Sequence, residues 1–324
     1  MEIFKNLSKP KKSIVFDTYW RFAKKRQDIF FNKLNLITPL TTDPILERHR
    51  FTNVYRASDR VSQYLIRNVI YKDGVTFTKN DLLLRILLFK IFNKISTWEY
   101  LESQIEKITI ENFDSKLYSK LLTEAKEAKE VIYSGAYIMT SGKSIFGRDY
   151  KHENHLELLS QYIQSGRLLE SIEKAKSMED VYNILLSVPT FGSFLAYQYT
   201  IDINYSTLTN FSEMDFVKAG PGAKDGIKKC FIDRGDFTDE DIIKYMCDIQ
   251  YEQFEKLDLD FKDLWGRKLQ LIDCQNLFCE VDKYSRVAHP EISGLSNRTR
   301  IKQVYKPENN NINYYFPPKW ELNI

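Results

Sequence analysis

The chain has 324 residues, with 47 Lys and Arg against 44 Asp and Glu and a formal net charge of +3. This balance permits nucleic-acid binding without requiring it, and any basic surface has to come from local clustering. With 43% hydrophobic residues, 12 Gly and 9 Pro, the chain is neither disordered nor collagen-like, and its length suits one large or two ordinary domains.

The first predicted helix covers residues 13–35, where aromatic residues alternate with Lys and Arg at helical spacing. It follows a basic lead-in, residues 1–12, that lacks the apolar segment of a signal peptide. A second helix is predicted over 48–71. Its five arginines either meet DNA phosphates or form a solvated face: Arg48, Arg50, Arg56, Arg60 and Arg67.

The middle of the chain predicts more helices. Thr78 caps an apolar helix over 81–94, Ser96 and Glu99 open another as a capping box, and residues 112–131 form an exposed one. Residues 131–147 are rich in β-forming residues and predict a hairpin or an irregular loop. The sequence SGKS within them is not a nucleotide-binding P-loop, because Tyr137 stands where the first glycine is needed.

Helices are also predicted over 154–172, 178–187, 238–258 and 261–284, followed by an extended tail over 285–324. The overall prediction is a mainly α protein. His152 and His155 are expected to be surface histidines, and no metal site is predicted, because a third ligand is not recognisable. The four cysteines lack zinc-site spacing and predict reduced, mostly buried thiols in the cytoplasm: Cys230, Cys247, Cys274 and Cys279. No run of residues is apolar enough to span a membrane.

Two glycine turns stand out. In VPTFG, residues 188–192, proline fixes φ ahead of the turn, and Gly192 can adopt the positive φ of a chain reversal. The turn fits a helix-hairpin-helix, whose free amides hold a DNA phosphate. On this stretch alone, an ordinary αα-hairpin is the alternative. In the second turn, residues 220–226, the pattern GxGxxxG followed by lysines suits either an anion site or a plain turn.

Five stretches together carry a family resemblance: DPILERHRFTNVYRASDRVSQYLI (43–66), SGAYIM (134–139), TFGSFLAYQYTIDINYS (190–206), FVKAGPGAKDGIKKCF (216–231) and LFCEVDKYSRV (277–287). They resemble the DNA-glycosylase-like proteins named α-glutamyl/putrescinyl-thymine pyrophosphorylases, a module also named as the helical domain of 5-hydroxymethyluracil DNA kinases. The resemblance implies a helix-hairpin-helix DNA-glycosylase-like fold over 13–305, with two helical lobes and a cleft between them as one arrangement, and a separate tail over 306–324.

The resemblance also implies a substrate, a modified pyrimidine in phage-type DNA that is flipped out of the duplex. A carboxylate then has to support the reaction. Asp202 is ranked first because it lies in the best-matching stretch and ends an apolar helix, where an unpaired carboxylate is costly to bury. Asp215 and Glu213 follow.

DNA contacts are predicted for residues of the arginine helix and both glycine turns: Arg56, Arg60, Thr190, Gly192, Ser193, Gly220, Gly222, Lys224 and Lys228. The predicted base pocket consists of Asn53, Gln63, Tyr197, Tyr199 and Tyr205. The alternative for the tyrosines is a packed core.

The function that we expect from these features is a monofunctional DNA glycosylase. It would excise a bulky 5-substituted pyrimidine from double-stranded phage DNA, leave an abasic site, and serve in phage defence as a cytoplasmic monomer without a cofactor. Since no kinase domain or P-loop is recognisable, the chain is expected to act alone. The alternative is a transferase that attaches an amino acid or amine to an activated 5-hydroxymethyluracil and displaces pyrophosphate. A non-catalytic DNA-binding module is the third hypothesis.

Overall fold

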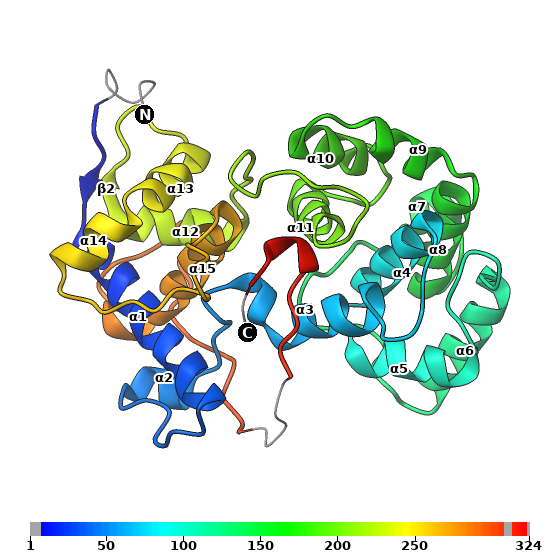
Figure 1. Cartoon of the computed structure of the whole chain (residues 1–324), viewed down its shortest axis with the longest axis horizontal. Helices are drawn as coiled ribbons and strands as arrows, with labels where there is room; N and C mark the ends of the chain where they lie inside the picture. Colours follow the sequence, from blue (N-terminus) through cyan, green and yellow to red (C-terminus); the bar gives the residue numbers. More distant parts are fainter. Residues whose placement is uncertain (1–7, 308–312, 323–324) are drawn as a thin grey trace. The chain divides into compact units, whose positions relative to one another are not determined.

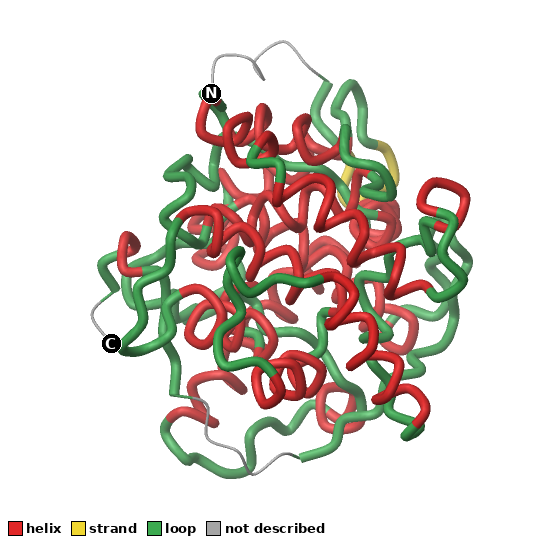
Figure 2. The backbone as a smooth tube through the Cα atoms, turned by 90° about the vertical axis from the view of Figure 1, so that its right-hand side faces the viewer, coloured by secondary structure: helices red, strands yellow, loops and turns green. Residues whose placement is uncertain are grey.

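The computed structural model describes residues 8–307 and 313–322. Over these ranges the chain is mainly helical, as predicted, and its only sheet has two strands (Figures 1 and 2). The chain divides into two compact units. Unit 1 comprises the described residues of 8–59, 216–313 and 321–322, and unit 2 comprises 60–215 and 314–320.

Unit 1 contains β1 (Lys11–Lys12), α1 (Ile14–Leu34), α2 (Pro44–Arg48), a 3-10 turn η2 (Arg56–Ser58), α12 (Pro221–Cys230), β2 (Phe231–Asp233), α13 (Asp239–Asp248), α14 (Gln250–Lys256) and α15 (Leu271–Ala288). Strands β1 and β2 are antiparallel, with Lys12 opposite Phe231. Helix α1 starts where the Ser13 side chain accepts a hydrogen bond from the Val15 amide. Its aromatic face packs on α15, where the Tyr19 and Phe278 rings lie 4.8 Å apart.

Helices α12 and α15 cross closely because α12 carries glycines on the shared face (Figure 1). A Cβ added at Gly226 would lie 2.1 Å from the Phe278 carbonyl oxygen, and one at Gly222 would lie 3.1 Å from the Cys279 sulfur. No side chain fits in the first position, since the neighbouring atom belongs to the backbone. The glycines of the second predicted turn are therefore explained by helix packing, and only Gly220, the N-cap of α12, lies in the turn itself.

Unit 2 contains α3 (Arg60–Tyr64), a π-helix η3 (Leu65–Ile70), α4 (Lys79–Phe92), α5 (Ile95–Gln104), α6 (Ser115–Glu127), α7 (Lys143–Phe146), α8 (Lys151–Leu159), a second π-helix η4 (Ser160–Gln164), α9 (Arg167–Lys174), α10 (Met178–Leu186), α11 (Ser193–Asn204) and the 3-10 turn η5 (Pro318–Trp320). Helix α4 is buried around nearly its whole circumference and forms the centre of the unit. Thr78, the predicted cap, begins it and forms a capping box with Asp81. The capping box predicted at Ser96 and Glu99 is wrong, because α5 begins at Ile95 with Lys94 as its N-cap.

The buried Arg85 of α4 joins this centre to the π-helix. Its guanidinium donates hydrogen bonds to the carbonyl oxygens of Asn68, Val69 and Ile108. Carbonyl groups that the wider turn of a π-helix leaves without a regular partner are thereby satisfied.

Helices α10 and α11 form the predicted hairpin, but the residue with positive φ is Thr190 rather than Gly192. Thr190 has a φ of 73°, whereas Gly192 has an extended backbone and acts as the N-cap of α11. The prediction about Gly192 is wrong in this respect. The chain reverses two residues earlier, at a β-branched residue for which this conformation is strained.

Several predicted helices also have different bounds, and the predicted helix 154–172 is divided into α8, η4 and α9. Residues 49–59 form a loop with the 3-10 turn η2 instead of the first half of a 48–71 helix. The Asp59 side chain accepts a hydrogen bond from the Asn53 backbone amide, and Glu280 of α15 accepts one from the Thr52 backbone amide. The predicted helix 238–258 is broken at Ile249 into α13 and α14, and the last long helix begins at Leu271 rather than at 261.

Candidate functional site

The five stretches that carry the family resemblance gather in two places. In unit 1, the loop 49–59 and helix α12 both contact α15, which contains the stretch 277–287. In unit 2, the stretches 134–139 and 190–206 meet, since the rings of Tyr137 and Phe194 are stacked 5.6 Å apart. Both places are candidate sites, and each is described below on its own unit.

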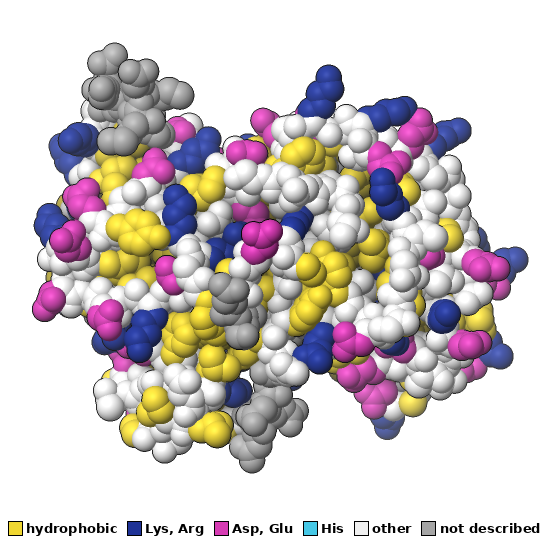
Figure 3. Space-filling model, viewed as in Figure 1, with side chains coloured by type: hydrophobic (Ala, Val, Ile, Leu, Met, Phe, Trp, Pro, Cys, Tyr) yellow, Lys and Arg dark blue, Asp and Glu magenta, His cyan; other side chains and the backbone are white. Residues whose placement is uncertain are grey.

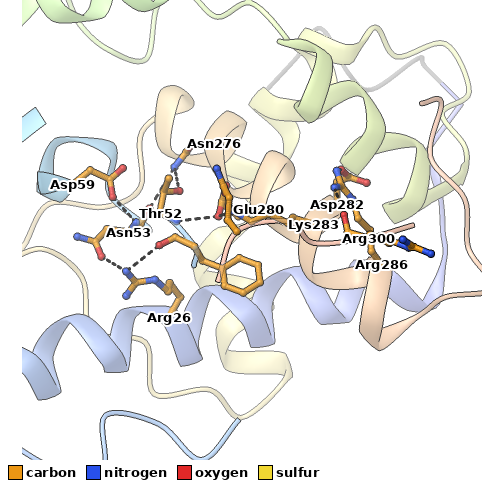
Figure 4. A network of polar contacts seen from close by, with 12 residues as sticks. Arg26, Thr52, Asn53, Asp59, Asn276, Glu280, Asp282, Lys283, Arg286 and Arg300 are labelled. Carbon is orange, nitrogen blue, oxygen red and sulfur yellow. Dashed lines mark hydrogen bonds and ion pairs between the residues drawn. The ribbon is translucent and has the colours of Figure 1, made fainter. Parts of the chain in front are cut away.

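The unit 1 site is a network of polar side chains between the loop 49–59, α1 and α15 (Figure 4). The Asp59 carboxylate accepts a 2.7 Å hydrogen bond from the backbone amide of Asn53. The Arg26 guanidinium donates to the side-chain oxygen of Asn53. On the α15 side, Glu280 accepts from the Thr52 amide at 2.9 Å.

The loop is held in place by further bonds. The Asn276 amide group donates to the Thr52 hydroxyl and to the Asn53 carbonyl oxygen, at 3.0 and 3.3 Å. Asn53 in turn donates to the Ser58 carbonyl oxygen at 2.7 Å. Side chains that are fixed at both ends in this way keep a constant geometry, as a binding or catalytic site requires.

Asp59 is a carboxyl group of this network whose charged form is disfavoured by burial. Burial raises the pKa of its carboxyl to about 6, against the opposing effects of the Asn53 amide and the Arg26 guanidinium. The side chain remains half-buried. A carboxylate with a pKa near neutrality and a path to solvent can accept a proton from a substrate.

Sequence reasoning missed Asp59 as a site residue. Within the sequence it reads as an ion-pair partner of the neighbouring arginines, although it lies inside the longest of the resembling stretches. Asn53, a predicted base-pocket residue, does lie in the network. The signal that could have found Asp59 is its occurrence with Asn53 and Thr52 in one stretch that is not helical.

In unit 2, Asp202 lies at the end of α11 and is fully buried, next to the equally buried Lys90 of α4. The Lys90 ammonium lies 3.4 Å from the Asp202 carboxylate and donates to the Asn93 side chain at 2.8 Å. It also lies 4.7 Å from the centre of the Tyr137 ring. Lys90 therefore supplies the counter-charge that the sequence did not reveal, and the pair connects α4, α11 and the loop 131–142.

The other two predicted carboxylates differ in exposure. Glu213 is buried and Asp215 is exposed in the loop after α11. The predicted tyrosines are all packed side chains of unit 2, with Phe191 against Tyr199 and Trp320 against Tyr205. Tyr197 is also fully buried, and Gln63 accepts a hydrogen bond from the Tyr315 amide.

A cavity of about 430 Å³ lies elsewhere in unit 2, between α5, α6 and residues 128–132. None of the predicted base-pocket residues lines it.

The residues predicted to contact DNA are split between the two units. Those of unit 1 are Arg56, which is buried, and four residues at α12: Gly220, Gly222, Lys224 and Lys228. Those of unit 2 are Arg60, Thr190, Gly192 and Ser193. The two lysines, Arg60 and the residues at the start of α11 are exposed. Gly192 has no neighbouring atom within 4 Å of a Cβ position.

The two histidines expected at the surface are buried instead. His152 lies 2.9 Å from the Thr123 hydroxyl, and His155 joins the Tyr133 hydroxyl to the Thr140 carbonyl oxygen. Burial lowers the pKa of His155 to about 4, so it is neutral at physiological pH. Across residues 8–307 and 313–322 no group of three His, Cys, Asp or Glu side chains is arranged to hold a metal, and no helix is long and apolar enough to cross a membrane.

Comparison with known proteins identifies the resemblance. The family described as "5-hmdU DNA kinase, helical domain" matches residues 13–294. A protein of Bacillus phage SP10 named 5-hmdU DNA kinase is 27% identical over 286 residues, which make up 83% of this chain and 45% of that relative. The chain thus spans less than half of the relative's length. No solved structure matches the chain.

These findings correct the predicted function. The expected monofunctional glycosylase is a hydrolase that leaves an abasic site, whereas the relative is named as a kinase, which is a transferase. The prediction of excision is therefore wrong, and the alternative prediction, a transferase acting on 5-hydroxymethyluracil, agrees better with the relative. The match over most of the chain confirms the predicted resemblance: the chain belongs to the family of the 5-hmdU DNA kinase helical domain.

Proposed function

We propose that this chain recognises 5-hydroxymethyluracil in DNA and takes part in transferring a group onto its 5-substituent. The observation that carries the proposal is the family match over residues 13–294. Because the chain corresponds to less than half of the phage relative, the relative's complete activity is carried over only as part of this proposal. For the fold, the hairpin of α10 and α11, whose second helix begins at the exposed residues Gly192 and Ser193, supports a relationship to the helix-hairpin-helix proteins.

The unit 1 network offers the chemistry that such a transfer needs. When the 5-hydroxymethyl oxygen forms a bond to the phosphorus of a phosphoryl donor, the bond from that phosphorus to the rest of the donor breaks, and the hydroxyl proton has to pass to a base. Asp59 is suited to accept that proton, since burial raises its pKa to about 6. The Asn53 backbone amide orients the Asp59 carboxylate, and Arg26 holds the Asn53 side chain. Transfer of an amine to an activated 5-methylene needs the same base to deprotonate the amine.

The predicted carboxylates of unit 2 fit this chemistry less well. Asp202 is buried against Lys90, an arrangement that favours a structural role. Glu213 is also buried, and Asp215 lies in an exposed loop.

The proposal is tested by measuring how the chain binds duplexes that differ at one base. Fluorescence anisotropy should show about tenfold tighter binding to a duplex with one 5-hydroxymethyluracil than to the same duplex with thymine, because a site that bonds the hydroxyl loses that bond with thymine. Equal affinity for both duplexes would contradict it. A second assay measures the masses of the nucleosides by mass spectrometry after two incubations. In one, DNA with 5-hydroxymethyluracil is given a phosphoryl donor, and in the other, DNA with the pyrophosphorylated base is given an amine.

In the mass assay, Asp59→Asn should reduce formation of either product by 100-fold or more, on the order of a lost general base. The matched control is Asp248→Asn, which removes one carboxylate from the exposed end of α13 in the same unit. The role of Asp59 is contradicted if both variants form product at the same rate.

A further inference from the structure

A basic segment after α15 is fixed along unit 1 and is not used by the site above. We call residues 298–306 the basic strap. The strap and the neighbouring end of α2 carry six exposed cationic side chains: Arg48, Arg50, Arg298, Arg300, Lys302 and Lys306. The strap itself contains no acidic residue, and α2 contributes only Glu47. Throughout the part of the chain that the structure describes, no acidic side chain forms an ion pair with any of the six.

The strap is held through its backbone, so its charged groups are left for a ligand. The Arg50 amide donates to the Gln303 carbonyl oxygen at 3.1 Å, and the Tyr305 amide donates to the Arg48 carbonyl oxygen at 3.0 Å. These bonds pair the strap antiparallel to the chain around His49, which forms a bridge with Val304. Two cationic stretches distant in the sequence are thereby brought side by side.

Helix α15 fixes the strap at two further points. Arg286, which is paired with Asp282, donates to the Arg300 carbonyl oxygen at 3.1 Å (Figure 4). The Lys283 ammonium lies 3.4 Å from the Gln303 side-chain oxygen. Just before the strap, the Ser296 amide donates to the buried Asp225 at 2.7 Å. A cationic segment anchored at this many points loses little conformational freedom on binding a polyanion.

We infer that the basic strap, with Arg48 and Arg50, binds the sugar–phosphate backbone of the DNA substrate. This inference rests on the proposed function. Guanidinium and ammonium groups at alternate positions 298, 300 and 302 suit a ligand with regularly repeated negative charge. Val304 and Tyr305, which lie between Lys302 and Lys306 in the chain, are exposed and provide apolar contact surface. The strap pairs with residues 48–50, which continue along the chain into the loop that contains Asp59.

The test is the salt dependence of DNA binding. Each phosphate contact contributes about 0.9 to the slope of log Kd against log salt. The triple variant Arg298→Gln/Arg300→Gln/Lys302→Gln should lower that slope by ~2–3 and weaken binding at least ~10-fold at low salt. The control variant Lys107→Gln/Lys116→Gln/Lys120→Gln removes three exposed charges from unit 2 and should leave the slope unchanged.

The outcome for the strap is separable from the outcome for the proposed function. Phosphate contacts carry no base information, so the triple variant should lose the same factor on thymine and 5-hydroxymethyluracil duplexes. Preference for the modified base is given by the ratio of the Kd values for the two duplexes, and this ratio does not depend on the strap. The inference is overturned if the triple variant keeps the melting temperature of the unmodified protein and its salt slope is unchanged. The strap would then be a binding surface for an acidic protein partner.

Discussion

At the scale of single residues, two carboxylates of the candidate sites, the buried Asp202 and the half-buried Asp59, differ in how their charge is balanced. Asp202 has the Lys90 ammonium 3.4 Å away, whereas the pKa of Asp59 is raised to about 6 because burial outweighs its polar contacts. A buried ion pair is costly to break and can be replaced as a unit by apolar residues. A carboxyl with a raised pKa makes stability depend on pH.

For the ion pair, Lys90→Met should lower the free energy of unfolding by ~3–5 kcal/mol, because it leaves the Asp202 charge buried without its countercharge. The double variant Lys90→Met/Asp202→Leu should recover part of this loss. Urea unfolding of the single and double variants gives the interaction energy from a double-mutant cycle. If the two single effects simply add, the pair is not the contact that connects α4 and α11.

The Asp59 carboxyl has a pKa of about 6 in the folded protein and an ordinary value of 3.8 in the unfolded chain. Protonated Asp59 therefore favours the folded state fully below pH 3.8, and this contribution to the free energy of unfolding is lost as the pH rises through about 6. Between pH 4 and pH 7 the free energy of unfolding of the unmodified protein should therefore fall by at most about 3 kcal/mol relative to that of the Asp59→Asn variant. Unfolding free energies at four or five pH values measure the difference. The same comparison with Asp248→Asn provides the control, and a flat Asp59→Asn difference would show that Asp59 is well solvated.

At the scale of elements, the crossing of α12 and α15 depends on glycine. Gly226→Ala should destabilise the protein by ~1–3 kcal/mol, because a Cβ there would overlap the Phe278 carbonyl group and the helices would have to separate. Thermal unfolding measures the effect. Gly135→Ala is the matched control, since no atom lies within 4 Å of a Cβ at that glycine. Equal melting temperatures for the two variants would contradict the close crossing.

The elements also show what the sequence could and could not provide. Helices α1 and α4 were predictable, because their apolar faces and the Thr78 cap are local signals. The loop 49–59 was not, because Thr52 binds Glu280, which lies 228 residues later in the sequence. For the same reason the role of Gly226 and the partner of Asp202 stayed hidden. Each is decided by a residue on a distant helix.

At the scale of the whole molecule, the basic and acidic side chains are intermixed on the face seen in Figure 3, in keeping with the near-zero charge balance. A binding surface for DNA therefore has to arise where the fold brings basic stretches together. The pairing of residues 48–50 with 303–305 does this within unit 1, and it could not be predicted from either stretch alone.

The two longest parts of unit 1 are separated in the chain, with residues 60–215 of unit 2 between them. On the ribosome, α1 emerges long before α15, the helix that covers its aromatic face. At ordinary translation speeds this delay is on the order of tens of seconds. The nascent chain exposes an apolar surface during that interval, so recombinant yield should depend on chaperone supply and growth temperature more than the stability of the finished protein suggests.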